Sequence, residues 1–543
     1  IMATATLALE GQLSIGWIVG QVGSSEVGET TYIEIGEFED LTPDVILSSP
    51  KASYGIKGSG PMDRVAGTGT LKFTMDNSVL NSGGVLGYYT PGHTNARTGW
   101  EIGKSIRLKA SFDGTDYYKF RGTLINCSPT AGTHGRRIVD CTAVDWMDDA
   151  ARSRIKNLDI ATDQRSDQLV TTLVTDSVTK QPAATSFATG QSTFDYAFDN
   201  LSDAKTPVLR ALADVVISEL GFLYVKGDTT QGGTLKFEDR HTRPKAGAAV
   251  GDFDETMNSL EISRSRGDLI NRAYVIVHPR TVDGSVTALY ELTTTQTNPN
   301  VIAGQTITLI APFTEASINA YRVAGQSLVT PVSGTDWVAN SAADGSGTNL
   351  TSDVVVTLAE TSANSVTFQI VNNHATLTAY LTTLQVRGTG VRDTTQTILT
   401  ASDTTSERDF GEIDTRIDMK YESNAGEYGN EIAKWILNIY KDPRNVVKKM
   451  SIIGNSSDAL MTQCLAREPG DKITLTEAMT GIESTGGSGA ELAFFINGVD
   501  FEILKGNICK ATWTLAPAEQ QSAWILQTLG ASECGISTNL GFA

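Results

Sequence analysis

Apolar and polar residues alternate along many short stretches of this chain, a pattern typical of β-strands with one buried face. Thr70–Met75 alternates in this way and stops at Asp76-Asn77. Ile106–Phe112 also alternates and runs into Asp113-Gly114, a pair that tolerates positive φ and so predicts a hairpin. Further runs with a period of two predict strands at Ile138–Val144, Ala273–Val277, Thr306–Ile310, Val354–Leu358, Val366–Val371, Leu381–Val386, Ile473–Leu475, Phe494–Phe501 and Ala511–Leu515.

Helical spacing of apolar residues is confined to a few segments. Gln164–Val178 has an apolar face, and Thr206–Leu220 opens with Pro207, which suits the first turn of a helix. Asn430–Tyr440 is followed by a proline that ends the pattern, and Glu519–Leu529 is a fourth candidate. The chain therefore reads as mainly β, with a small α/β part near residues 156–250.

Two distant stretches follow the same order of features. Gly103–Leu108 leads through a turn to Phe120–Leu124 and then to a strand near Cys141. Gly470–Leu475 leads through the glycine-rich segment 486–489 to Phe495–Val499 and then to Ala511–Leu515. We interpret them as two copies of one small antiparallel barrel. Hairpins of this kind also occur by chance in any β-rich chain, so spacing alone leaves that alternative open.

The pattern divides the chain into several expected units. Strand runs with polar turns between residues 285 and 392 predict an inserted sandwich of immunoglobulin or jelly-roll type. The full expected division is an N-terminal extension (1–37), a first hub barrel (38–155), an α/β domain (156–250), a second hub barrel with a helix (251–284 with 393–530), the inserted sandwich (285–392) and a C-terminal tail (531–543).

Composition narrows the class of protein. The 543 residues suggest about three or four domains. The formal charge of −19 argues against a protein that reads nucleic-acid sequence, because such a protein needs basic residues to neutralise phosphates. No apolar window is long enough to predict a membrane-spanning helix, and no secretory signal is expected at the N-terminus. The five cysteines form no CxxC pair, so we interpret them as buried small side chains of a protein made in a reducing compartment.

Motifs for catalysis and for metal binding are weak. Gly99–Ser105 resembles a phosphate-binding loop but is one residue short and precedes a strand instead of a helix, so a plain turn is the better interpretation. Asp344–Gly347 with Asp353 offers oxygen ligands but lacks the spacing of a calcium loop. Asp113 and Asp116 flank a hairpin and are expected to be turn residues. HExxH and GxSxG sequences are absent. The sequence therefore predicts no catalytic, cofactor-binding or metal-binding residues.

Aromatic residues in the expected sandwich suggest one possible ligand. Such rings can stack on sugars, but Phe368 alternates with polar neighbours and is expected in the core. A glycan-binding platform therefore remains an alternative to a purely structural role. The residues concerned are Tyr321, Trp337, Phe368 and Tyr380.

A series of short motifs runs along the chain in a fixed order. They are Asp40–Val45, Tyr54–Ile56, Asp63–Gly69, Leu71–Asn77, Gly87–His93, Gly103–Leu108, Tyr118–Gly122, Ala425–Asn430, Asp442–Arg444, Phe495–Val499 and Trp513–Pro517. Together they resemble the baseplate-hub or minor-tail family of tail-tip proteins in long-tailed, siphovirus-like bacteriophages. In that family a strand ending in Asp-Asn, a YYSPG-like turn, a GxxVR strand and an FxG strand recur in this order. Thr90 replaces the usual serine, and the resemblance covers residues 38–530.

The resemblance implies a structural virion protein and not an enzyme. Three chains with two barrels each would form a pseudo-six-fold ring that joins the six-fold tail tube to a three-fold tip. The implied partners are the other copies of the homotrimer, a distal tail protein or tube ring, the tape measure protein, and a tail fibre or other tip proteins. DNA would pass through only as cargo, and no cofactor is implied. The implied location is the virion tail tip, after assembly in the bacterial host cytoplasm.

Two other functions stay open at this stage. A receptor-binding adhesin would use the 285–392 sandwich to hold a host glycan, and a cell-wall hydrolase would use a pair of carboxylates that sequence cannot identify. The acidic composition agrees with a conduit, since a net acidic wall would repel DNA phosphates and let the duplex slide. We therefore expect a net acidic pore wall.

Overall fold

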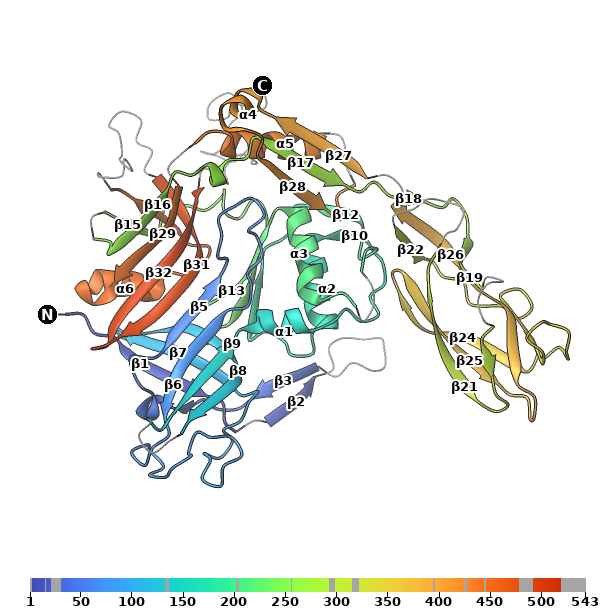
Figure 1. Ribbon diagram of the computed structural model, residues 1–543, viewed down its shortest axis with the longest axis horizontal. Helices are drawn as coiled ribbons and strands as arrows, with labels where there is room; N and C mark the ends of the chain where they lie inside the picture. The colour runs from blue at the N-terminus through green and yellow to red at the C-terminus, as the bar shows by residue number, and fades with distance from the viewer. Residues whose placement is uncertain are drawn as a thin grey trace.

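The computed structural model describes residues 2–14, 16–20, 31–131, 136–201, 205–254, 256–292, 298–314, 322–393, 396–423, 427–443, 446–477 and 492–518. Strands dominate this part of the chain and helices are few, which confirms the prediction of a mainly β protein with a small α part (Figure 1). The predicted helix at Glu519–Leu529, the turn at 486–489 and the tail at 531–543 lie outside the described residues.

One sheet of 13 strands forms the main body. Its path runs β16-β29-β32-β31-β5-β6-β9-β8-β7-β1-β4, while β30 pairs with β31 and β15 pairs with β30. The strands are β1 (Thr6–Gly11), β4 (Glu39–Asp40), β5 (Lys51–Gly55), β6 (Thr70–Asp76), β7 (Ser105–Phe112), β8 (Thr115–Thr130), β9 (Ile138–Val144), β15 (Gly251–Phe253), β16 (Ser259–Ser263), β29 (Val446–Ile453), β30 (Lys472–Leu475), β31 (Leu492–Leu504) and β32 (Ile508–Pro517).

Two features of this sheet bear on the expected division of the chain. The expected N-terminal extension contains β1, which pairs with β7 along six residues and so belongs to the sheet. The two expected barrels are parts of one continuous sheet, and no pairing among the described strands closes either part into a barrel. Periodicity predicts strands and their buried faces, but not which edges meet. A separate hairpin joins β2 (Gly16–Gly20) to β3 (Thr31–Ile35).

A helical part packs beside this sheet, as Figure 1 shows for α1, α2 and α3 next to β13. Buried residues recur every three or four positions along these helices and so lie on one face of each. That face packs with the neighbouring strands in one apolar core. Asp145 caps the first of these helices by accepting from Met147 N. The elements are α1 (Trp146–Arg152), α2 (Ser166–Ser177), α3 (Val208–Glu219), β10 (Ala161–Arg165), β11 (Ala184–Phe187), β12 (Thr193–Ala197), β13 (Phe222–Lys226) and β14 (Thr234–Glu238).

A second small sheet, β27-β17-β28, packs against α5. The predicted helices at 164–178, 206–220 and 430–440 are confirmed as α2, α3 and α5, within a few residues at each end. The helices α1, α4 and α6 escape prediction because seven to nine residues show too little of a helical period. The elements are β17 (Arg272–Val277), β27 (Thr397–Ser402), β28 (Asp414–Met419), α4 (Thr404–Phe410), α5 (Glu427–Tyr440) and α6 (Asp458–Ala466), with short 3-10 turns at Thr42–Asp44, Arg266–Asp268 and Gly454–Ser456.

The segment between β17 and β27 forms a lobe at the right of Figure 1. Two sheets, one built around β26 and the other β21-β25-β24, enclose a common core. The long strand β26 pairs with five others, β18, β19, β20, β22 and β23. The strands are β18 (Thr281–Val282), β19 (Thr287–Glu291), β20 (Asn300–Val301), β21 (Thr306–Pro312), β22 (Arg322–Gln326), β23 (Trp337–Asn340), β24 (Val354–Ser362), β25 (Ser365–Asn372) and β26 (Ala379–Asp393).

Where this lobe meets the body, a buried histidine lies between two carboxylates. His278 Nδ1 is 2.7 Å from Asp393 Oδ2, and His278 Nε2 is 2.7 Å from Asp418 Oδ1. Asp393 ends β26 and Asp418 lies in β28, so one side chain links the lobe to the body. Burial alone would raise the pKa of Asp418, but the hydrogen bonds from His278 and Lys420 outweigh it and lower that pKa to about 2.

Candidate assembly surface

Two sets of five strands in the main sheet have the same order. We call β5, β6, β7, β8 and β9 the first repeat, and β16, β29, β30, β31 and β32 the second repeat. In space the first repeat runs β5-β6-β9-β8-β7 and the second runs β16-β29-β32-β31-β30. Every one of these pairings is antiparallel. The internal duplication predicted from spacing therefore holds at the level of strand order.

The two repeats also agree residue by residue at one turn. Gly103 N donates to Leu124 O at 2.7 Å, and Gly470 N donates to Ile496 O at 2.8 Å. In each repeat the residue after the glycine accepts the return bond, at 2.8 Å from Leu124 N and at 2.9 Å from Ile496 N. Both glycines have a φ above +90°, a conformation that other residues rarely adopt. Chance hairpins would not share this register.

A β-bulge follows at the same place in both repeats. The register between β8 and β9 shifts after Leu124, and the register between β31 and β32 shifts after Ile496. The extra residues are Ile125 in the first repeat and Asn497 in the second. Because a bulge bends its strand, the matching bulges bend the two repeats at the same place.

The repeats are joined by a seam between the first strand of one and the fourth strand of the other. β5 pairs with β31 from Gly55–Gly498 to Lys51–Glu502. The bonds from Ile56 N to Asn497 O (2.8 Å) and from Ile503 N to Pro50 O extend the ladder at both ends. The seam therefore joins segments more than 400 residues apart in sequence.

A buried polar cluster supports the seam. Glu468, which precedes β30, accepts from Tyr54 Oη at 2.9 and 3.0 Å and from Gly227 N at 2.9 Å. The ammonium of Lys119, in β8, contacts the same carboxylate and donates to Leu465 O at 3.0 Å. Burial raises the pKa of Glu468, and the adjacent Lys119 opposes that rise. The cluster thus connects strands of both repeats through one carboxylate.

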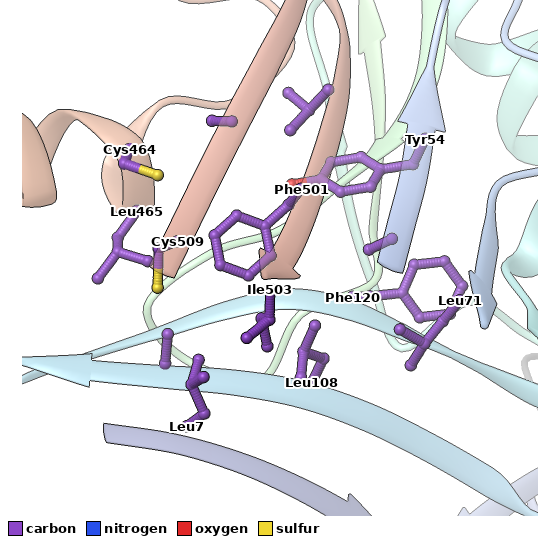
Figure 2. Packing of buried hydrophobic residues seen from close by; sticks show 14 of the residues in the cluster. Leu7, Tyr54, Leu71, Leu108, Phe120, Cys464, Leu465, Phe501, Ile503 and Cys509 are labelled. Atoms are coloured by element: carbon purple, nitrogen blue, oxygen red, sulfur yellow. The ribbon is translucent and has the colours of Figure 1, made fainter. Parts of the chain in front are cut away.

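The apolar side chains of the two repeats share a single core. Figure 2 shows side chains of the first repeat and its neighbour β1 on one side, and side chains of β31, β32 and α6 on the other. The first group includes Leu7, Tyr54, Leu71, Leu108 and Phe120, and the second includes Cys464, Leu465, Phe501, Ile503 and Cys509.

The bulge residue is buried in one repeat and exposed in the other. Asn497 is only 2% exposed, accepts from Arg243 Nη1 at 2.7 Å and donates to Gly58 O at 2.7 Å. Ile125, at the equivalent place, has 36% of its surface exposed. Arg243 and Gly58 therefore cover the bulge of the second repeat, whereas the bulge of the first repeat is partly exposed among the described residues.

Each repeat consequently leaves one strand edge uncovered among the described residues. Residues 125–130 of β8 pair with β9 on one side only, because the pairing with β7 ends at Thr123. β16 pairs with β29 on one side only. Residues 125–130 are largely exposed, and β16 alternates between exposed and half-buried residues. An open edge offers unpaired backbone donors and acceptors, so we regard these two edges as the candidate assembly surface.

The weak motifs found in the sequence are structural. Gly99–Ser105 forms a turn that enters strand β7, which confirms the interpretation of this segment as a plain turn. Asp113 has a φ of +47° at the hairpin, and Asp116 lies 3.3 Å from Lys109 Nζ. Asp344 bonds Ser346 within its own loop. Over the described ranges, no three His, Cys, Asp or Glu side chains gather closely enough to hold a metal ion.

Two of the four aromatic residues considered for a glycan-binding platform lie in the core of the lobe. Trp337 is 7% exposed and Phe368 is fully buried, and both belong to the core between the two sheets. Tyr380 is half-buried, and Tyr321 lies outside the described residues. The core position of Phe368 follows from its alternation with polar neighbours, whereas Trp337 gives no such signal.

Helices that could span a bilayer are not found among the described residues. No protein-family model matches the sequence, and no curated protein sequence matches it.

The chain is similar in structure to solved phage tail proteins over most of its length. A tail protein from Neisseria meningitidis MC58 matches with a TM-score of 0.43 and 8% identity, covering 94% of this chain and 96% of that one. The 43 kDa tail protein of prophage MuSo2 from Shewanella oneidensis matches with a TM-score of 0.45 and 8% identity, covering 95% and 97%. Prophage tail protein gp18 from Listeria monocytogenes EGD-e matches with a TM-score of 0.38 and 9% identity, covering 88% and 91%.

Proposed function

We propose that this chain is a structural tail-tip hub of a long-tailed bacteriophage and works as a homotrimeric ring. Its task is to join the six-fold tail tube to the three-fold tip and to form part of the conduit for DNA. The order of the motifs along the sequence supports this function. The structural observation that carries it is the repeated strand order with one open edge on each repeat.

The internal seam supplies a template for the contact between chains. Within one chain, the first strand of the first repeat pairs with the fourth strand of the second repeat. The first strand of the second repeat, β16, and the fourth strand of the first repeat, β8, have matching open edges. If β16 of one chain pairs with β8 of the next, each contact between chains copies the contact within a chain. Three chains then close a ring of six similar units.

The template also gives a register. Gly498 corresponds to Asn126 and Lys51 corresponds to Glu261, as the shared ladders with β32, β9, β6 and β29 establish. The pair Ser53–Asp500 in the seam then corresponds to Ser263–Ser128 between chains. Pro129 is equivalent to Phe501 of the seam and has no N–H. The contact between chains therefore has one hydrogen bond fewer at this residue than the internal seam.

The remaining parts of the proposal follow from the ring. A net acidic chain would place negative charge around a central passage and keep DNA phosphates from adhering. The tube or distal tail protein, the tape measure protein and fibres or other tip proteins would be its neighbours in the virion. Assembly in the host cytoplasm and opening during infection complete the proposed cycle, which needs no enzymatic step.

A cysteine pair tests the ring directly. Ser128→Cys and Ser263→Cys are introduced into one chain in which Cys127 is replaced by serine, and the variant is assembled into tail tips. Oxidation of those particles should link neighbouring chains into a covalent trimer on a non-reducing gel. A cross-strand pair of this kind places two Cβ atoms within disulfide range.

The internal seam provides the matched control. Ser53→Cys with Asp500→Cys should form a disulfide within one chain and run as a monomer. If this control closes but the 128–263 pair stays unlinked in assembled tips, the proposed contact is wrong. Density of an intact tip that shows the chain in any number of copies other than three around the axis would refute the hub itself.

A further inference from the structure

Two cysteine thiols face each other across neighbouring strands of the first repeat. Cys127 in β8 is directly opposite Cys141 in β9, and their Sγ atoms are 3.8 Å apart. Cys141 is 2% exposed and belongs to the apolar core, whereas Cys127 is half-buried and packs against that core. One thiol is therefore within reach of a reagent from solution and the other lies directly behind it.

The backbone geometry suits a bond between these sulfur atoms. Asn77 N donates to Arg137 O at 2.9 Å, next to the ladder between β6 and β9. Hydrogen-bonded pairs alternate from there, so Phe73–Cys141 is a hydrogen-bonded pair and the N–H and C=O of Cys141 point to β6. Cys127–Cys141 is then a non-hydrogen-bonded pair of β8 and β9, the type in which side chains approach most closely. A Cα separation near 4.5 Å lies within the range that disulfides accept.

The two thiols differ in reactivity. The Cys141 thiol donates to the sulfur of Cys127 and so lowers the pKa of Cys127. Burial raises the pKa of Cys464 to about 12 and that of Cys509 to about 11, which keeps each of these two thiols unreactive. Oxidation is therefore directed to Cys127 first.

We propose that Cys127 and Cys141 are a redox-sensitive site that closes to a cross-strand disulfide when the chain meets a small-molecule disulfide outside a reducing compartment. The Cys127 thiolate attacks one sulfur of glutathione disulfide and expels one glutathione thiolate, which takes up the proton that Cys127 lost. Cys141 then gives up its proton, attacks the Cys127 sulfur and expels the second glutathione. The protein loses two electrons and two protons, and one glutathione disulfide becomes two glutathiones.

The bond would fasten β8 to β9 beside the open edge of β8. Cys127 lies within residues 125–130, the segment that the proposed ring uses, but the chemistry of the thiol pair does not depend on that ring. The interpretation of the cysteines as buried small side chains would then be complete for Cys464 and Cys509, whereas Cys127 and Cys141 would also be reactive.

Peptide mapping of the full chain tests the site. The protein is incubated with glutathione disulfide, remaining thiols are alkylated, and trypsin is added without reduction. Cleavage after Arg121, Arg136, Arg137 and Arg152 separates the two cysteines, so the disulfide appears as peptides 122–136 and 138–152 joined together. We expect this linked species to dominate, with an upward shift of the unfolding midpoint that dithiothreitol reverses.

Three variants make the result decisive. Cys127→Ser and Cys127→Ala should abolish the linked peptides and the shift, whereas Cys509→Ala should leave both unchanged. Complete alkylation of Cys127 and Cys141 after incubation would overturn the proposal. A stable glutathione adduct on Cys127 without the second step, or a link to Cys534 in its place, would also overturn it.

Discussion

The two repeats of the main sheet share strand order, a glycine turn and a bulge, yet they use opposite edges. In the first repeat, β5 pairs across the seam and the edge of β8 stays open. In the second repeat, β31 pairs across the seam and the edge of β16 stays open. Asn497 and Ile125 mark the difference, one buried by polar contacts and the other exposed at the same bulge. A duplicated unit with complementary open edges is what a closed ring of such units requires.

The repeats also differ in what they carry between equivalent strands. The second repeat has the β17 sheet, the lobe and α5 inserted between its first two strands, β16 and β29. The first repeat connects its first two strands by a short loop, residues 56–69. Insertions of this size are tolerated because the connections run over the surface and the end-to-end closure cost grows only slowly with length.

The largest expected effect is loss of the carboxylate that supports the seam. Glu468→Ala leaves the fully buried Lys119 without its counter-charge, and we expect a loss of about 3–5 kcal/mol in the free energy of unfolding. Chemical denaturation followed by tryptophan fluorescence measures it. A double variant, Lys119→Met with Glu468→Gln, should recover most of the loss. Equal losses in the single and double variants would show that the charge pair is not the cause.

The pH dependence of stability should distinguish the repeats. Asp145, which follows β9, is buried and its pKa is raised to about 7 by desolvation, whereas the second repeat has Pro517 at the equivalent place. The folded chain favours the protonated form of Asp145. The stability that this protonation contributes is therefore complete below pH 4 and is lost as pH rises through about 7.

Asp145→Asn should remove that dependence, because its amide is neutral at all pH values. The difference in unfolding free energy between variant and wild type should change by on the order of 1.4 kcal/mol for each pH unit between pH 4 and pH 7. Over that whole interval the change is roughly 4 kcal/mol. Thermal unfolding from pH 5 to pH 8 gives the comparison. Parallel curves for the two proteins would contradict the raised pKa.

The matching glycines should respond unequally to alanine. Both have positive φ, which costs about 1–2 kcal/mol for alanine. A Cβ on Gly470 would lie 2.2 Å from Tyr224 Oη, whereas a Cβ on Gly103 meets no atom within 4 Å. We therefore expect Gly470→Ala to destabilise by about 1–3 kcal/mol more than Gly103→Ala. Equal losses of unfolding free energy would show that Tyr224 moves aside freely.

The smallest effect is expected at the exposed pair of the seam. Lys51 Nζ and Glu502 Oε2 are 3.3 Å apart, and the lysine side chain is more than half exposed. Glu502→Gln should cost less than about 1 kcal/mol, and the cost should fall further in high salt. A loss as large as that of Glu468→Ala would mean that surface charge, and not the buried cluster, holds the repeats together.

Much of the local structure was predictable because apolar residues recur at short, regular intervals in the strands and helices. The alternation in Ile138–Val144 gives β9 with the observed bounds, and apolar spacing gives α2, α3 and α5. The duplication showed itself in Gly103 and Gly470, since only a turn with positive φ needs glycine at both places.

The candidate assembly surface was not predictable in the same way. β5 is five residues long and its partner β31 is hundreds of residues away, so no local pattern points to the seam. The same lack of long-range information hides from the sequence that strands of the two expected barrels pair into one continuous sheet. Burial of Trp337 and the opposition of Cys127 to Cys141 likewise depend on which strands meet, and register is set by the whole sheet.

The single strand β26 gives the lobe an unusual mechanical character. Five other strands are fastened along its 15 residues, and its last residue, Asp393, is held by His278. A force along β26 at the far end of the lobe would shear its backbone hydrogen bonds together, instead of unzipping them one at a time. The lobe also contacts the helical part at Ala363, whose N donates to Leu158 O at 2.7 Å, so a load on it would reach the body at two places, His278 and Leu158.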